Sequence, residues 1–248
     1  MNLYYEFTFN DTNEYKNMKR LYEIVEPYID TYSQLDTLVK DKYTKTDISI
    51  NFNNGLNNNA LNNNGLNNTG FNNKVLKFNI FDGDITDGIK WTWCSNDTTL
   101  YYFKSFLQSI NFNERLKSFT NSSTSFTIKG ASFITLNTDS VTDTHFHYDI
   151  MSQYDNDDTN IITILFPLYS LDTAMGGLEY NVSNTSTVYK YKPNHIIMWD
   201  SCKFLHRTEP YILERPKKRI LVSINLCTSE PWAISAVDKC LKSQGNML

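Results

Sequence analysis

Apolar side chains near the start of the chain recur at the three- and four-residue spacing of an amphipathic helix. The pattern runs over residues 18–39, and one of residues 10–12 (Asn-Asp-Thr) could cap the start of the helix. Pro27 interrupts it, so either the helix kinks there or a second helix begins with this proline in its first turn. We expect the apolar face to pack against the outside of a sheet.

Later in the chain, short runs of β-type residues are separated by Gly, Pro, Asn and Asp. One run, Val75–Ile80, precedes a second predicted helix at about Asp97–Phe119. The other predicted strands are Ser125–Ile128, Ser132–Leu136, Thr144–Tyr148, Ile161–Leu168, Gly177–Asn181, Thr187–Tyr191, His195–Trp199 and Arg219–Leu226. Helices followed by many short strands predict an α+β, mainly β, jelly roll, with the N-terminal helices packed on one sheet and a β core at about residues 125–228.

Residues 51–73 differ in composition from the rest of the chain, since 13 of these 23 residues are Asn. Leu or Phe recurs there every five residues, but four repeats are too few for a stacked-coil architecture. Tracts rich in Asn are usually disordered. We therefore expect residues 1–248 to form a single domain that carries residues 51–73 as a low-complexity insertion.

Charge and cysteine usage narrow the class of protein. The formal net charge of −4 does not favour binding to nucleic acid or to anionic membranes. The sequence has no apolar run of 18 residues, and its first residues do not resemble a signal peptide. The four cysteines show no short pairing such as C-x-x-C, which favours reduced thiols. We expect a cytoplasmic protein without a membrane segment.

His147-Tyr148-Asp149, with His206 located 59 residues later, has the composition of a facial-triad iron site. In a strand, residues two apart point to the same face, so His147 and Asp149 can bind the same ion. The intervening residues hold enough strands to return the chain to the same end of a barrel. A rival set, His145, His147 and His206, would be a cupin-like metal site, although no Glu follows shortly after His147.

Arg219 opens the last predicted strand, 13 residues after His206. Its planar guanidinium could bind a carboxylate through two parallel hydrogen bonds. Lys217 and Lys218 are nearby substitutes if the register differs. On the predicted strand, Arg219 shares one face with Leu221, Ser223 and Asn225, and the residues between them share the other.

These residues together resemble the Fe(II)- and 2-oxoglutarate-dependent oxygenases of the prolyl-hydroxylase-like branch. The resemblance spans Ser132–Leu226 and includes the HxD motif, Gly176-Gly177, Leu205-His206-Arg207 and the Arg219 strand. It implies a double-stranded β-helix, iron bound by His147, Asp149 and His206, and Arg219 on the distal carboxylate of 2-oxoglutarate. Thr163 or a Tyr could add a hydrogen bond to that carboxylate.

The resemblance implies hydroxylation of a C–H bond with release of succinate and CO₂, with ascorbate as a supporting reductant. The primary substrate would be a protein side chain or a small molecule. Nucleic acid is not expected, because Asn225 stands where nucleic-acid demethylases often carry a second Arg. Two alternatives remain: a non-catalytic cupin-like module that binds a metal or ligand, and an interaction protein that works through its Asn-rich segment.

Overall fold

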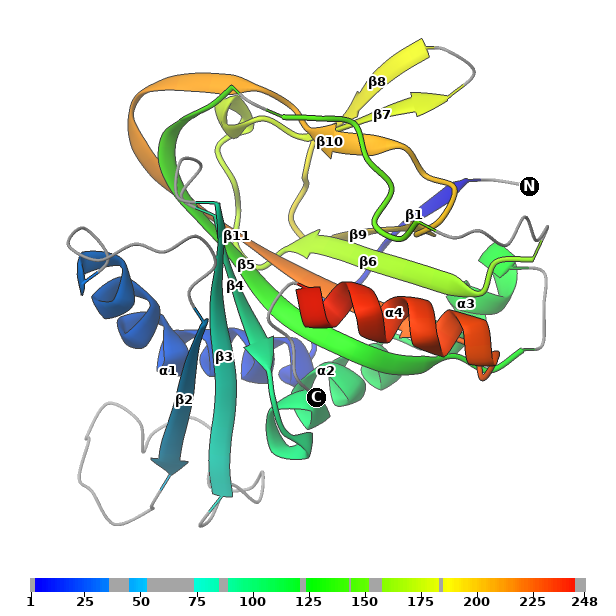
Figure 1. Ribbon diagram of the computed structural model, residues 1–248, viewed down its shortest axis with the longest axis horizontal. Helices are drawn as coiled ribbons and strands as arrows, with labels where there is room; N and C mark the ends of the chain where they lie inside the picture. Colours follow the sequence, from blue (N-terminus) through cyan, green and yellow to red (C-terminus); the bar gives the residue numbers. More distant parts are fainter. Residues whose placement is uncertain are drawn as a thin grey trace.

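The computed structural model describes residues 3–35, 45–52, 74–84, 89–120, 124–142, 144–151, 158–182 and 185–243 (Figure 1). Its strands are β1 (Tyr4–Thr8), β2 (Lys45–Phe52), β3 (Lys74–Asp84), β4 (Ile89–Cys94), β5 (Thr127–Val141), β6 (Ile161–Pro167), β7 (Leu178–Val182), β8 (Thr185–Tyr189), β9 (His195–Asp200), β10 (His206–Thr208) and β11 (Tyr211–Cys227). Its helices are α1 (Asn13–Leu35), α2 (Asp97–Ser109), α3 (Phe112–Thr120) and α4 (Pro231–Ser243).

The described strands form two antiparallel sheets. The larger has the order β1-β9-β6-β11-β5-β4-β3-β2, and the smaller has the order β10-β7-β8. His147 extends the smaller sheet through an isolated bridge to His206. From β5 onwards the chain passes alternately between the two sheets, which is the winding of a double-stranded β-helix. The predicted jelly roll is confirmed.

The two faces of the large sheet have different roles, as β11 illustrates. Ile220, Val222 and Ile224 are buried in the main hydrophobic cluster together with side chains of α1, α2 and α3. Leu221 and Ser223 point to the other face and line a cavity. This alternation follows from the two-residue period of a strand. The first three helices therefore cover one face of the sheet, as predicted, and leave the opposite face for the site.

The first helix begins where the sequence pattern indicated. The Thr12 hydroxyl accepts a hydrogen bond of 3.1 Å from the Tyr15 amide, so Thr12 is the cap among residues 10–12. Helix α1 continues through Pro27 to Leu35, and the predicted extension to residue 39 lies outside the described residues. One helix with an internal proline thus replaces the alternative of two helices.

Several predicted boundaries were wrong. The helix predicted at Asp97–Phe119 is two helices, because Asn111 between them has a φ of +52°, in the left-handed region that Asn tolerates. The strands predicted at Ser125–Ile128 and Ser132–Leu136 are one long strand, β5. The strand predicted at Thr144–Tyr148 is reduced to the bridge at His147. Strands β1, β2, β4 and β10 and helix α4 were not predicted.

The predicted insertion falls almost entirely outside the described residues. Asn51 and Phe52 belong to β2, which pairs antiparallel with β3, and residues 53–73 are not described. The arrangement as a single domain with an insertion stays a prediction. No helix in the described ranges is both long enough and apolar enough to cross a membrane.

Candidate metal centre

The bridge between His147 and His206 brings the two predicted imidazole ligands together. Each residue donates its amide N–H to the other's carbonyl oxygen, at 2.9 and 3.0 Å, and the ring centroids are 4.7 Å apart. The chain bends after the bridge, where the Ile150 amide bonds to the Ser201 carbonyl oxygen at 3.1 Å. Asp149 lies in this bend, so the convergence comes from a bridge followed by a bend rather than from one continuous strand.

The candidate ligand atoms of His147, Asp149 and His206 all lie within 4.8 Å of one another. Oδ1 of Asp149 is 3.4 Å from Nε2 of His206. Ligands in adjacent positions around one ion, each with a bond of about 2.0–2.2 Å, are separated by roughly 3 Å. The spacing therefore fits a single first-row metal ion, and two imidazoles with one carboxylate are the donor set of facial-triad iron.

Both imidazoles use Nδ1 in a hydrogen bond to the backbone, which leaves Nε2 for a metal. Nδ1 of His147 is 2.9 Å from the His145 carbonyl oxygen, and Nδ1 of His206 is 3.0 Å from that of Phe204. A carbonyl oxygen can only accept, so each Nδ1 carries a hydrogen, and in the neutral ring Nε2 then presents the lone pair. These two hydrogen bonds to backbone carbonyl oxygens orient both rings, a task that a carboxylate performs in some metal sites.

His206 is buried, and its surroundings favour the neutral ring. It is 5% exposed and stacks on Phe204 with ring centroids 5.5 Å apart. Burial lowers the pKa of His206 below its ordinary value, against the opposing attraction of the Asp149 carboxylate. The neutral imidazole is the form that binds a metal, so the environment of His206 suits a ligand.

The second oxygen of Asp149 is bound by two donors from the large sheet. The Thr163 hydroxyl donates to Oδ2 at 2.6 Å and the indole N–H of Trp199 donates to it at 2.8 Å. Thr163 is in turn 2.8 Å from the Ser201 hydroxyl and accepts from the Asn225 amide at 3.3 Å. Oδ2 is therefore occupied, and Oδ1 is left to face His206.

His145 does not join the cluster. The ligand atoms that converge within the described residues are those of His147, Asp149 and His206. His145 supplies its carbonyl oxygen to His147, and its side chain lines the neighbouring cavity. The rival His145–His147–His206 set is not brought together.

Arg219 lines the same cavity of about 480 Å³ as the three ligand candidates. The residue is 4% exposed, and its guanidinium donates to the Met175 carbonyl oxygen at 3.3 Å. Its carbon Cζ also lies 5.7 Å from the centre of the Tyr191 ring. Among the described side chains, no carboxylate pairs with this buried cation. Most of its five N–H donors are therefore left for an anion.

The two lysines that were considered as substitutes for Arg219 are engaged elsewhere. Lys217 pairs with Asp172, and Lys218 pairs with Glu26 and Asp30 at 2.8 and 2.9 Å. These pairs lie outside the cavity lining. Arg219 is thus the cation that the fold directs to the site.

Tyr191 fits the expected additional donor better than Thr163, whose only hydroxyl hydrogen is directed to Asp149. Burial raises the pKa of the Tyr191 phenol to about 12, although Arg219 opposes this rise. The phenol therefore keeps its proton near neutral pH and can donate a hydrogen bond. Tyr191 lines the cavity next to Arg219, so both could reach one carboxylate.

Sequence reasoning missed two contributions to the site. Trp199 was assigned to an apolar strand, and only its inward direction reveals the bond to Asp149. Cys240 of α4 lies 3.3 Å from the Asp149 carbonyl oxygen, and burial raises the pKa of this thiol to about 11. The spacing of Ala233, Val237 and Leu241 is a helical signal that could have revealed α4.

No protein-family profile and no curated protein matches the sequence. Among solved structures, a prolyl-4-hydroxylase from Pseudomonas putida is 10% identical, with a TM-score of 0.40 over 57% of this chain and 73% of that one. HygX from Streptomyces hygroscopicus, with nickel and 2-oxoglutarate bound, is also 10% identical, with a TM-score of 0.46 over 59% and 73%. A viral collagen prolyl hydroxylase from Paramecium Bursaria Chlorella virus-1 is 15% identical, with a TM-score of 0.41 over 57% and 80%.

Two of these neighbours are prolyl hydroxylases, and the third has 2-oxoglutarate bound. At such low identity and TM-score the likeness is one of fold in part of the chain. The function has to be inferred from the residues that this chain brings together.

Proposed function

We propose that this chain is an Fe(II)- and 2-oxoglutarate-dependent dioxygenase that hydroxylates a C–H bond of a protein side chain or a small molecule, with release of succinate and CO₂. The observation that carries the proposal is the combination of two features in one cavity. His147, Asp149 and His206 present the donor set of a facial triad, and Arg219 is a buried cation without a carboxylate partner in the described part of the chain.

The residues of the chain have separate tasks in this proposal. His147, Asp149 and His206 would hold iron on one side and leave its remaining positions open. When bound, the iron supplies the activation of O₂, a chemistry that amino-acid side chains lack. Trp199 and Thr163 keep the Asp149 carboxylate in one orientation through their bonds to Oδ2.

Arg219 and Tyr191 would bind the distal carboxylate of 2-oxoglutarate. The guanidinium offers two parallel donors and the protonated phenol offers one more. A buried cation costs free energy unless an anion pairs with it, so this end of the cavity favours an anionic cosubstrate.

The decisive experiment is to incubate the protein anaerobically with Fe(II) and 2-oxoglutarate, record the absorbance of the complex, and then admit air with ascorbate present. We expect a metal-dependent absorbance band and succinate release even without a primary substrate. Asp149→Ala should abolish both, whereas His145→Ala and the exposed variant Asp238→Ala should preserve both. Metal binding that survives Asp149→Ala but is lost in His145→Ala would support the cupin-like module instead.

A further inference from the structure

The cavity has an apolar wall that the proposed steps do not use. The apolar wall comes from β4, β5 and α4 and consists of Ile89, Trp91, Trp93, Ile134, Val237 and Leu241. The charged and titratable groups that line the cavity are the residues of the metal centre, His145, Arg219, Tyr191 and Cys240. The volume of about 480 Å³ lies within the usual range for small-molecule sites.

The register of the large sheet places the apolar wall beside the candidate metal centre. Trp91 pairs with Ile134, and Ile134 pairs with Leu221, so these residues form one row across β4, β5 and β11. The row meets β11 at Leu221, which lies between Arg219 and Asn225 along the strand. Asn225 donates a hydrogen bond to Thr163, beside the candidate metal centre. Strands are spaced about 4.8 Å apart, so Trp91 lies about 10 Å to the side of β11.

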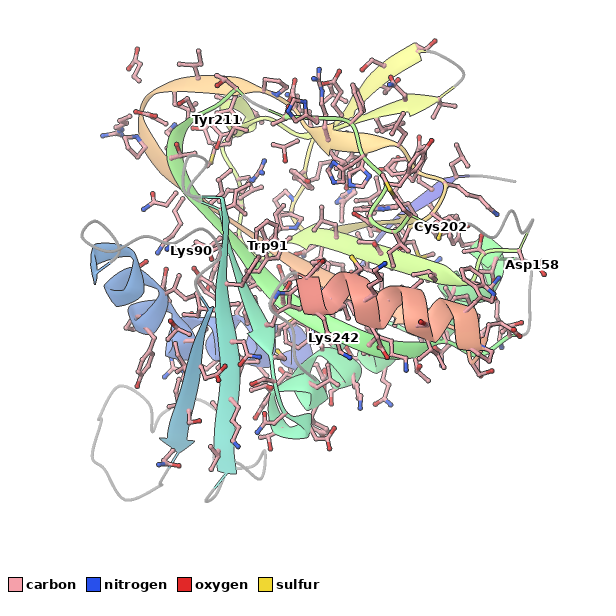
Figure 2. All side chains as sticks on the ribbon, viewed as in Figure 1. Lys90, Trp91, Asp158, Cys202, Tyr211 and Lys242 are labelled. Carbon is pink, nitrogen blue, oxygen red and sulfur yellow. The ribbon has the colours of Figure 1, made fainter. Side chains whose placement is uncertain are left out.

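Helix α4 completes the apolar wall from the other side. Val237 and Leu241 are buried in one cluster with Trp93 and Ile150. Figure 1 shows α4, in red, lying across the face of the large sheet that the first three helices leave uncovered. The nearest cation on β4, Lys90, projects to the opposite side of the strand from Trp91 (Figure 2).

We propose that the apolar wall binds the group to be hydroxylated, and that this group is uncharged and either aromatic or branched aliphatic. The inference rests on the proposed function, because it takes the space next to the metal as the substrate site. A charged group would lose its hydration against this wall without finding a partner. Trp91 is half-buried, and its indole N–H makes no hydrogen bond to a described residue, so it can donate to one carbonyl or hydroxyl oxygen of the substrate.

The test uses the whole metal-free protein and the neutral fluorescent probe N-phenyl-1-naphthylamine. We expect saturable binding at one site and energy transfer from tryptophan to the probe. Leu241→Asp should weaken binding at least tenfold, because it places a charge in the apolar wall. Leu241→Met and the charge-matched Ser235→Asp, on the exposed side of α4, should bind like the wild type. Equal probe affinity in Leu241→Asp and the wild type would overturn the proposal.

Because Leu241→Asp could unfold α4 locally, a second pair of variants changes the apolar wall on β4 instead. Trp91→Gln should weaken the probe at least threefold while Trp91→Phe retains it, and circular dichroism should show the same helix content in both. Unchanged binding in Trp91→Gln would also count against the proposal. This assay needs neither iron nor 2-oxoglutarate. Probe binding without succinate release would therefore reject the enzyme and keep the apolar site, whereas succinate release without probe binding would do the reverse.

Displacement of the probe then distinguishes a side chain of a peptide from a free small molecule as the substrate that carries the apolar group. N-acetyl-phenylalaninamide and N-acetyl-leucinamide represent side chains of a peptide, and indole and p-cresol represent free small molecules. Displacement by either pair supports the apolar class and identifies its source. Stronger displacement by N-acetyl-lysinamide or by glucose than by all four would refute it.

Discussion

The indole N–H of Trp199 donates a 2.8 Å hydrogen bond to Oδ2 of Asp149, a residue 50 positions earlier in the chain. The Thr163 hydroxyl donates to the same oxygen, while Oδ1 faces Nε2 of His206 at 3.4 Å. Two donors on one oxygen prevent the carboxylate from turning. In the proposed metal centre, Asp149 would therefore bind the metal through Oδ1.

Replacing Trp199 by Phe should weaken metal binding by about 10- to 100-fold, the usual effect of losing a group that orients a metal ligand. The phenyl ring keeps most of the packing but cannot donate to Oδ2. Anaerobic titration with Fe(II), or with Co(II) as a spectroscopic substitute, measures the change. Trp232→Phe on α4 is the matched control and should bind like the wild type. Equal affinity in Trp199→Phe and the wild type would remove the orienting role.

Replacing Arg219 by Leu should raise the Kd for 2-oxoglutarate and leave the affinity for the metal alone nearly unchanged. Hydrogen bonds to a charged group contribute about 1.5–3 kcal/mol, which corresponds to a loss of roughly 10- to 150-fold. Arg219→Lys should recover only part of this loss, because an ammonium lacks the planar pair of donors. The metal-dependent absorbance band measures the Kd. Lys217→Leu, outside the cavity, is the control.

The sequence was sufficient to predict the ligand candidates because few residue types can form such a centre. His147, Asp149 and His206 stand at a spacing that a jelly roll can close, and the structure brings their ligand atoms within 4.8 Å of one another. The reason given for their shared direction was incomplete. Of the HxD pair, only His147 pairs with a strand, through its bridge to His206, and Asp149 is directed by its bonds to Thr163 and Trp199. Those bonds join residues that are distant in sequence.

The contributions that sequence reasoning missed, or left without a residue number, depend on contacts between distant segments. Trp199 stands at the end of an apolar run, and the run alone does not say which side of the sheet it faces. Tyr191 follows β8, and it approaches Arg219 only because the chain returns across the cavity. Helix propensity also does not reveal the break at Asn111, where a single residue in the left-handed conformation separates α2 from α3.

Replacing Gly177 by Ala should destabilise the fold by at least about 2 kcal/mol, within the usual range for overpacking. A β-carbon there would lie 2.2 Å from the Tyr189 backbone oxygen and 2.9 Å from Cγ1 of Val188. For a chain of this size the melting temperature should fall by roughly 4–8 °C. Adding Val188→Ala should restore little, because the backbone oxygen of Tyr189 remains. An unchanged Tm in Gly177→Ala would show that β7 and β8 can separate freely.

The ion pair between Glu179 and Arg207 should make stability depend on pH, because it ties β7 to the strand that carries His206. Nε of Arg207 donates to the Glu179 carboxylate at 2.8 Å, and Arg207 and Glu179 are directly opposite in the register. This hydrogen bond lowers the pKa of Glu179 below its ordinary value, although burial opposes the shift. The stabilisation is therefore complete above the pKa of an unfolded glutamate and is lost as the pH falls through the lower folded value.

We expect Glu179→Gln to lower the free energy of unfolding by about 1 kcal/mol at pH 7, a modest value because the pair is partly exposed to solvent. The difference between the wild type and Glu179→Gln should shrink as the pH falls from 5 to 3, because the unfolded glutamate takes up a proton in this range before the folded one does. Urea unfolding at several pH values measures it. Glu114→Gln, in the exposed pair with Lys117, should match the wild type throughout. A difference that stays constant down to pH 3 would mean that Glu179 acts through packing and not through its charge.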